Sequence, residues 1–475
     1  MPRSILLALA VMAAAHGAAA QESDSAVVDF VLRPTDDPDS RVDDDIWAWD
    51  SAPEDSIPED ELGPPLAGPT TEDPIGPPPA GPLLSEPQRA ERRVRGEETD
   101  PFAAIGMRLG AFVIRPAIEI GVEATDNVAG TEDKVGAVGL AVAPEINVRG
   151  ATDRYEIEMD LRGEAISYDR EEFNAQTADA RARARYEVTS RTALIGEAGY
   201  SRTLDDFTDP DTPGGAAERP AVDTFDASLG IEQRFGRVKA ELSGFAERAV
   251  HEEVPLSGGG LASREELDNT EYGGRLRTAY ASGRSLSPFV EVAGGRRDYD
   301  RNVDDSGFER ESIWGELRGG LIIDRGAKVS GEVSLGYRRE DIEDSRLEDL
   351  DILLADASIL WSPRRLTEVR FDFSTDTMST SEPGVSATVL YAGRLTLARS
   401  LTPRIRAETG AGLEFERSVG DDDRDVTFIG FAGASYTFNR TASIEGRYTY
   451  ERTESNQPGD DSEAHIVSVR LRLQR

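Results

Sequence analysis

The sequence predicts an all-β protein: a transmembrane antiparallel up-and-down β-barrel of about 18 strands, with 16 as the alternative count, after a disordered N-terminal arm. Three observations predict it. Apolar and polar residues alternate strictly from about residue 109 to the end, and the connections between the alternating segments are alternately short and long. The mean hydropathy is −0.45 and 38% of the residues are hydrophobic, which leaves no room for helical membrane spans.

The first segment, residues 1–20, has the features of a signal peptide. Arg3 provides the positive charge, an apolar run follows over residues 4–17, and three alanines offer a cleavage site before Gln21. The apolar run is too short to cross a membrane as a helix. We therefore expect the chain to leave the cytoplasm of a bacterium.

The second segment, residues 21–104, is acidic and rich in proline. Residues 22–100 carry a net charge of −16 and 13 of the 26 prolines. Such a segment buries too little apolar surface to offset the entropy lost on ordering, so we expect a disordered periplasmic arm. The isolated apolar group of residues 46–49 is either a short binding motif or tolerated exposure.

The third segment, residues 105–475, is predicted to form the barrel. Its alternation is seen where Tyr155, Ile157 and Met159 are separated by acidic residues. Eight short and nine long connections make 17, and hence 18 strands, so both termini are expected on the periplasmic side. Pro116 and Pro144 fall inside the first two strands, where a missing N–H weakens the assignment. A soluble sandwich is disfavoured, because 18 similar hairpins in series do not easily form two packed sheets.

Aromatic residues on the apolar face are predicted to form two girdles at the membrane interfaces. Those expected near the outer rim are Tyr200, Tyr337, Phe415 and Tyr448, and those expected near the inner rim are Tyr186, Phe235, Tyr280, Trp361 and Tyr436.

The opposite, polar face is predicted to line the pore. The candidate pore-lining residues are Arg404, Arg406, Glu408, Glu414, Glu445, Arg447, Arg470 and Arg472. Acidic and basic walls that face each other would select solutes by charge and size, whereas pairs that neutralise one another would line the pore passively. Residues 101–475 carry a net charge of −22, but much of it lies in loops, so cation selectivity is only weakly indicated.

The long loops are acidic, and they either bind divalent cations near lipopolysaccharide phosphates or remain solvated without a specific ligand. Asp300, Asn302, Asp304 and Glu311 have the outer spacing of a calcium loop. Asp305 stands where that loop requires glycine, so an ordinary hairpin loop is favoured. We expect no metal site and no cofactor.

Catalysis and nucleic-acid binding are also not expected. The chain has no Cys and three His, and neither His251 nor His465 has a serine or carboxylate partner at readable spacing. The net charge of −37 argues against phosphate binding.

Two stretches resemble a known family. Residues 105–116 lead into Ile118–Val122 and an Asp126-Asn127 turn, and the chain ends in the alternating segment Val469–Arg475. These stretches resemble the outer-membrane β-barrel porins of proteobacteria, several of which are associated with exopolysaccharide production or export. The resemblance implies outer-membrane lipid, lipopolysaccharide and the barrel assembly machinery as partners, together with a periplasmic or polysaccharide-export partner. The terminal Arg475 departs from the usual aromatic residue and implies a variant assembly signal.

The expected function is a porin-like channel for passive or substrate-biased passage of hydrophilic solutes or polysaccharide. Eighteen strands enclose an aqueous channel, unlike eight. The alternative is a non-conducting structural or docking barrel whose N-terminal arm binds a periplasmic partner of an envelope or exopolysaccharide export system.

Overall fold

The structure is a computed structural model that describes residues 102–282 and 285–475. The predicted signal peptide (1–20) and nearly all of the predicted arm (21–104) lie outside the described residues. The described residues contain no helix long and apolar enough to cross a bilayer.

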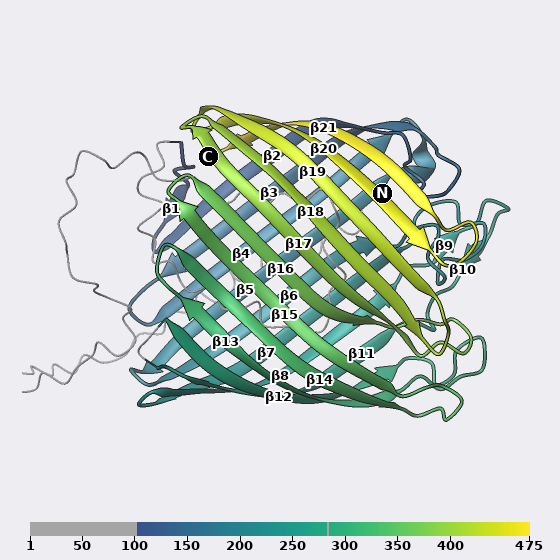
Figure 1. The fold of residues 1–475 in the computed structure, drawn as a ribbon, viewed down its shortest axis with the longest axis horizontal. Helices are drawn as coiled ribbons and strands as arrows, with labels where there is room; N and C mark the ends of the chain where they lie inside the picture. The colour runs from purple at the N-terminus through teal and green to yellow at the C-terminus, as the bar shows by residue number, and fades with distance from the viewer. Residues whose placement is uncertain (1–101, 283–284) are drawn as a thin grey trace, which may run out of the picture. The chain divides into compact units, whose positions relative to one another are not determined.

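Eighteen long antiparallel strands form a closed barrel, as predicted (Figure 1). The strands are β2 (Phe112–Thr125), β3 (Ala137–Ala151), β4 (Tyr155–Tyr168), β5 (Ala175–Thr189), β6 (Thr192–Leu204), β7 (Ala221–Phe235), β8 (Val238–His251), β11 (Asn269–Tyr280), β12 (Leu286–Tyr299), β13 (Ser312–Asp324), β14 (Val329–Ile342), β15 (Leu350–Arg364), β16 (Thr367–Met378), β17 (Ala387–Thr402), β18 (Ile405–Val419), β19 (Arg424–Asn439), β20 (Ala442–Ser455) and β21 (Ser462–Gln474). Short elements complete the fold: β1 (Met107–Leu109), which pairs with β2, the hairpin β9 (Val254–Pro255) and β10 (Leu261–Ala262), and a 3₁₀ turn, η3 (Glu171–Phe173).

The barrel closes because β2 pairs with β21 on one side and with β3 on the other. Closure satisfies the backbone N–H and C=O groups that an open edge would expose to hydrocarbon. The two prolines questioned from the sequence do lie in strands. Pro116 keeps its register opposite Ile146, whereas the β3–β4 register has no pairs at Ala143 and Pro144. Proline cannot donate to the ladder, which explains the local gap.

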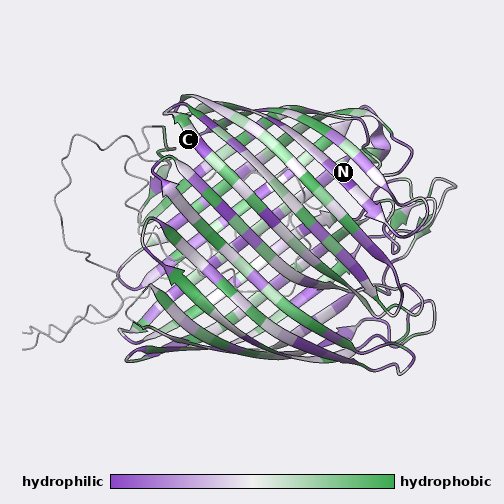
Figure 2. Ribbon diagram, in the orientation of Figure 1, coloured by the Kyte–Doolittle hydropathy of each residue, from purple (hydrophilic) through white to green (hydrophobic). Residues whose placement is uncertain are grey.

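The barrel is inverted relative to a soluble protein: its charged side chains are buried and its large apolar ones are exposed. Arg338 and Glu340 are 1% and 2% exposed, whereas Leu335 and Leu353 are 65% and 64% exposed. Figure 2 shows the two kinds of residue alternating along every strand. Buried charges face inward and exposed apolar residues face outward, as a barrel with a lipid-facing exterior requires.

Aromatic rings on the inner face lie flat over glycines of the next strand. A Cβ at Gly320 would lie 2.4 Å from the ring of Phe289, and one at Gly410 would lie 2.5 Å from the ring of Phe431. Only glycine leaves room for the ring at these positions. Arginine side chains in the lumen stack on these rings.

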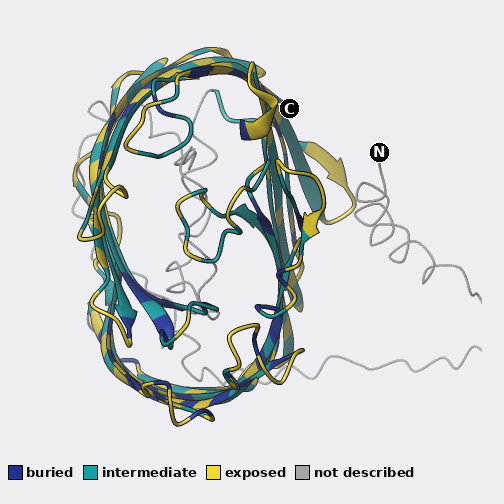
Figure 3. Cartoon of the chain, turned by 90° about the vertical axis from the view of Figure 1, so that its right-hand side faces the viewer, coloured by how far each residue is buried: buried dark blue, intermediate teal, exposed yellow. Residues whose placement is uncertain are grey.

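The barrel has two distinct ends. Short connections and the C-terminus lie at one, here called the turn end, and the long connections lie at the other, here called the loop end. Figure 3 looks into the loop end and shows long loops reaching over the opening. The loop over residues 252–268 contains the β9–β10 hairpin, a detail that the sequence pattern did not indicate.

One part of the wall departs from the barrel near the loop end. Strand β15 pairs with β14 from Leu350 onwards, but it pairs with β16 only from Ala357, opposite Phe373. Beyond that level the β16–β17 hairpin, residues 374–392, here called the flap, stays hydrogen-bonded to β18 but separates from β15. Ala387 and Val389 of the flap pack on the inner side chains of β15, so the wall is double-layered there.

Candidate functional site

The inner face of β11–β15 carries a network of paired charges. Arg338 forms an ion pair of 2.7 Å with Glu340, and Arg297 forms pairs of 2.8 Å with Glu271 and 3.4 Å with Glu340. The Arg338 guanidinium lies 4.1 Å from the centre of the Trp314 ring. Desolvated charges of this kind remain ionised only because each has an opposite partner, so this wall is rigid and close to neutral.

The wall formed by β2, β3, β4 and β21 contains the predicted pore-lining residues Arg470 and Arg472. Arg470 lies 2.6 Å from Glu164, and Arg472 lies 2.5 Å from Glu119 and 2.8 Å from Glu145. These contacts connect the last strand to the first three across the closure of the barrel. Both arginines face inward and have carboxylate partners.

Four other predicted pore-lining residues meet around one recess on the inner face of β18–β20. Arg406, Glu408, Glu445 and Arg447 line it, together with a segment of β19 at Gly433–Ser435. Arg447 lies 3.8 Å from Glu408, and Arg406 pairs at 3.4 Å with Glu368 of β16. Glu414 occupies the same face of β18, nearer the loop end.

The prediction for Arg404 is wrong. Arg404 lies in the turn before β18, which begins at Ile405, and it donates a hydrogen bond of 3.2 Å to the carbonyl of Phe438. Its guanidinium is also 5.3 Å from the ring centre of Phe102. Alternation put Arg404 on the inner face, but the chain has already left the strand there.

The predicted girdle residues lie on the outward-facing register positions. Six are exposed by 37–50%: Tyr186, Tyr280, Tyr337, Trp361, Tyr436 and Tyr448; Phe235 is 63% exposed, and Tyr200 and Phe415 are partly buried. The Tyr200 hydroxyl donates to Asp223 at 2.8 Å. Contact of these rings with lipid headgroups remains a prediction.

Acidic side chains gather at the loop end of the lumen. Glu416 of β18 and Glu451 of β20 face inward, and among the described residues neither forms an ion pair. Asp206 of the loop over residues 205–220 lies within electrostatic range of both. Asp206 itself pairs with Arg219 at 2.6 Å, so the ionised fraction of Glu416 and Glu451 gives this entrance its negative potential.

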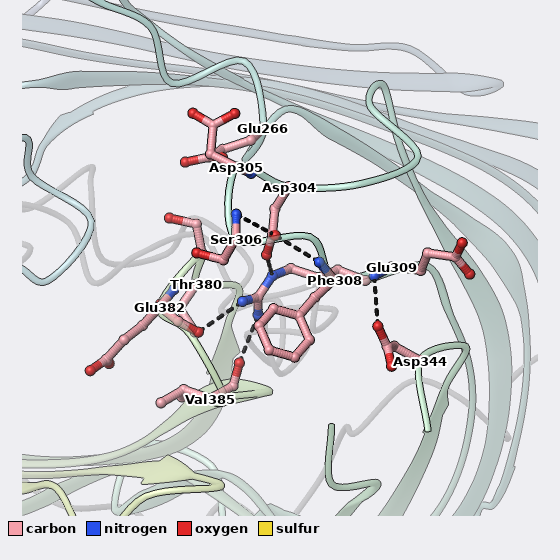
Figure 4. A network of polar contacts seen from close by, with 12 residues as sticks. Glu266, Asp304, Asp305, Ser306, Phe308, Glu309, Asp344, Thr380, Glu382 and Val385 are labelled. Atoms are coloured by element: carbon pink, nitrogen blue, oxygen red, sulfur yellow. Dashed lines mark hydrogen bonds and ion pairs between the residues drawn. The ribbon is translucent and has the colours of Figure 1, made fainter. Parts of the chain in front are cut away.

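Loops from different parts of the barrel are joined over the opening by Arg310 (Figure 4). Arg310 belongs to the loop over residues 300–311 and is 6% exposed. It pairs at 2.6 Å with Asp304 and donates hydrogen bonds of 2.7 and 2.8 Å to the carbonyls of Val385 and Glu382. One guanidinium thus fixes both its own loop and the tip of the β16–β17 hairpin.

A second contact reaches the same hairpin from the far side of the opening. Asp211, in the loop over residues 205–220, accepts hydrogen bonds of 2.8 and 2.6 Å from the amide and hydroxyl of Ser381. Eight strands separate the two loops around the ring of 18. Burial, and then the carboxylates of Asp205 and Asp211, raise the pKa of the neighbouring Asp209 to about 7.

In the acidic loop with calcium-like spacing, carboxylates form ion pairs with arginine. Asp300 pairs with Arg248 at 2.5 Å, and Asp304 pairs with Arg310. In the part of the chain that the structure describes, no group of three or more His, Asp or Glu is placed to hold a metal ion.

Both histidines have a carboxylate partner in the structure. The Nδ1 atom of His251 lies 3.1 Å from Asp268, and the Nε2 atom of His465 lies 3.2 Å from Glu463. Asp268 is 17 residues away, beyond any readable spacing. Among the described residues, no hydrogen bond joins either imidazole to a serine hydroxyl.

Sequence reasoning also missed Arg310, Asp211 and Arg338. Alternation along β14 would have placed Arg338 on the inner face, so this signal was present. Arg310 and Asp211 lie in loops, where no period assigns a direction to a side chain.

The closed ring, the inverted burial and the charged lumen define an outer-membrane β-barrel of the porin type. Residues 100–475 match the family described as "Putative beta-barrel porin 2", and the chain belongs to this family. A search of curated proteins gave no significant match.

The comparison with solved structures found outer-membrane proteins at low identity. OpdL of Pseudomonas aeruginosa is 10% identical with a TM-score of 0.39, covering 77% of this chain and 99% of that one. The siderophore receptor PirA of Pseudomonas aeruginosa is 9% identical with a TM-score of 0.38, covering 76% and 80%. The FrpB iron transporter of Neisseria meningitidis (F5-1 variant) is 7% identical with a TM-score of 0.38, covering 76% and 82%.

Proposed function

We propose that this protein is a channel that lets hydrophilic solutes cross the outer membrane, with a preference for cations. The observation that carries the proposal is the distribution of charge around the lumen. The inner face of β11–β15 is lined by paired charges, such as Arg338 with Glu340, whereas Glu416 of β18 and Glu451 of β20, near the loop end, form no ion pair among the described residues. A negative entrance between low-dielectric walls concentrates cations and repels anions.

In this proposal the long loops face the outside of the cell and both termini face the periplasm. Lipid and lipopolysaccharide surround the outer face, and the barrel assembly machinery inserts the chain. We propose no catalytic activity, because His251 and His465 pair with acids without a nucleophile. Outside the apolar cluster beneath the flap, charged side chains predominate on the inner face, which suits polar solutes.

The test is single-channel recording of the purified, refolded full chain in planar bilayers under a salt gradient. We expect discrete conductance and a reversal potential that indicates cation preference. The double substitution Glu416→Gln and Glu451→Gln should bring the reversal potential towards zero. Glu454→Gln is the matched control, because Glu454 is 63% exposed on the outward register of β20 and pairs with Arg452.

Two outcomes would overturn the proposal. Absence of conductance would favour the non-conducting docking barrel, and an unchanged reversal potential in the double variant would refute the acidic entrance. If the protein conducts, liposome swelling with sugars of increasing size would show whether the transported class is small solutes or polysaccharide.

A further inference from the structure

The seam between β15 and β16 is sealed by side chains instead of by a β-ladder. Beyond Ala357 the two strands have no paired backbone positions. Thr375 bridges them with its hydroxyl, and the remaining contact is an apolar cluster between the flap and the inner face of β15. The cluster consists of Leu350, Ile352, Leu354, Ala387, Val389 and Val419.

The flap has the alternation of a strand pair that belongs in the wall. Continuing the β15–β16 register would place Thr375 opposite Ala355 and Thr377 opposite Leu353. The odd-numbered residues of β17 face outward where the wall is regular, since Leu395 and Leu397 are 50% and 42% exposed. In the flap the same parity gives Ala387, Val389 and Tyr391, which are apolar or amphipathic. A flap that rejoined the wall would therefore present a suitable surface to lipid.

A line of glycines marks where the sheet bends inward. Gly393 of β17 pairs with Phe373, which is the residue of β16 nearest the loop end that still pairs with β15. Gly412 of β18 pairs with Arg394, and Gly430 of β19 pairs with Ala411. Glycine in a strand interior allows a bend that larger residues resist.

Two contacts hold the flap tip in the inward position. Arg310 donates to the carbonyls of Val385 and Glu382, and Asp211 accepts from Ser381. Both contacts join loops far apart in the sequence and would break if the tip moved towards the wall. The inward position has these contacts and the apolar cluster, whereas the outward position has additional backbone ladder pairs with β15.

We propose that the flap is a gate with two positions, inward as observed and outward in the wall, and that the outward position widens the mouth of the channel. The proposal rests on the channel function proposed above. The contacts of Arg310 and Asp211 with the flap tip set the relative populations of the two positions. A two-state element of this kind needs only a small bias to change its population.

The first test introduces two cysteines, which can pair only with each other because the chain has no natural Cys. In the variant Asp211→Cys with Ser381→Cys, the oxidised protein should form a disulfide that ties the flap inward. The proposal predicts two conductance levels, the larger of which belongs to the outward position. We expect oxidation to abolish the larger level and dithiothreitol to restore it. Failure of the disulfide to form, or a disulfide that leaves conductance unchanged in a conducting protein, would overturn the gate.

The second test does not depend on conductance, so it separates failure of the gate from failure of the channel. Spin labels at Pro383→Cys in the exposed flap tip and Leu353→Cys on the outer wall should show two distance populations. Arg310→Ala should increase the shorter one, because the tip then lies beside β15. Arg301→Ala is the matched control, because Arg301 pairs only within its own loop with Asp305 at 2.7 Å.

A milder variant guards against misfolding of Arg310→Ala. Ser381→Ala removes only the hydroxyl bond to Asp211 and should shift the same populations in the same direction, by less. A single distance population that neither variant changes would overturn the proposal.

Discussion

The hydroxyl of Thr375 forms two hydrogen bonds with the backbone of Ala355: it accepts from the amide and donates to the carbonyl, each at 3.0 Å. In a regular antiparallel pair the backbone groups of both residues would form these bonds. One side chain thus replaces two ladder bonds at the level where β15 and β16 begin to separate. The pairing of β15 with β16 at this level consequently depends on one side chain.

Thr375→Val should loosen the seam, because valine keeps the shape of threonine but leaves the amide and carbonyl of Ala355 without this partner. We expect a loss of about 1–3 kcal/mol in the free energy of unfolding and faster hydrogen exchange at Ala355. Urea titration and exchange followed by mass spectrometry measure the two effects. Thr396→Val in β17, where the hydroxyl faces the lumen, is the control and should change neither.

The conformation of the loop over residues 205–220 should depend on pH through Asp209. The pKa of this carboxyl is raised to about 7, so the observed conformation binds the proton more tightly than an open loop does. Stabilisation is complete below the ordinary pKa of an aspartate and is lost as the pH rises through about 7. Hydrogen exchange, corrected for its intrinsic pH dependence, should show a better protected loop at pH 5 than at pH 8.

Asp209→Asn should give a loop whose protection no longer depends on pH, because the amide stays neutral. The loop over residues 126–136 in the same molecule is an internal reference. Equal protection of the wild-type loop at both pH values would contradict the role of Asp209.

The buried lumen charges should be far more important for stability than neighbouring charges outside. Arg338→Ala removes the nearest cation from Glu340, 2% exposed, and leaves Arg297 alone to neutralise both Glu340 and Glu271. We expect a loss of about 3–5 kcal/mol on unfolding in urea. Arg339→Ala, one residue along, removes an exposed arginine from the outer face and should change the free energy of unfolding far less. Equal effects would refute the assignment of inner and outer faces.

Gly331 should not accept a side chain. Its φ is 150°, and a Cβ there would lie 2.0 Å from the carbonyl oxygen of Ser358 in the paired strand β15. Gly331→Ala should therefore destabilise the barrel by about 1–3 kcal/mol or lower the yield of refolding. Gly446→Ala in β20, where a Cβ meets no atom within 4 Å, should refold like the wild type.

Most of the architecture could be predicted because its determinants are local. The alternation of Val329–Tyr337 and the short turn before it identify a strand, and each strand pairs with its neighbour in the chain. The same alternation assigned Arg406, Glu408, Arg447 and Arg470 to the inner face. It failed for Arg404, because the period of two carries no information about where a strand ends.

The sequence by itself determined the barrel, the number of its strands and which residues face inward, since period-two alternation and hairpin connections are set by residues close together in the chain. Only the tertiary structure decided the partner of each charge, the inward position of the flap and the contacts across the opening. Asp211 and Ser381 are separated by 170 residues, and Arg310 and Val385 by 75. Contacts at such separations arise from the closure of the ring, which no local pattern records.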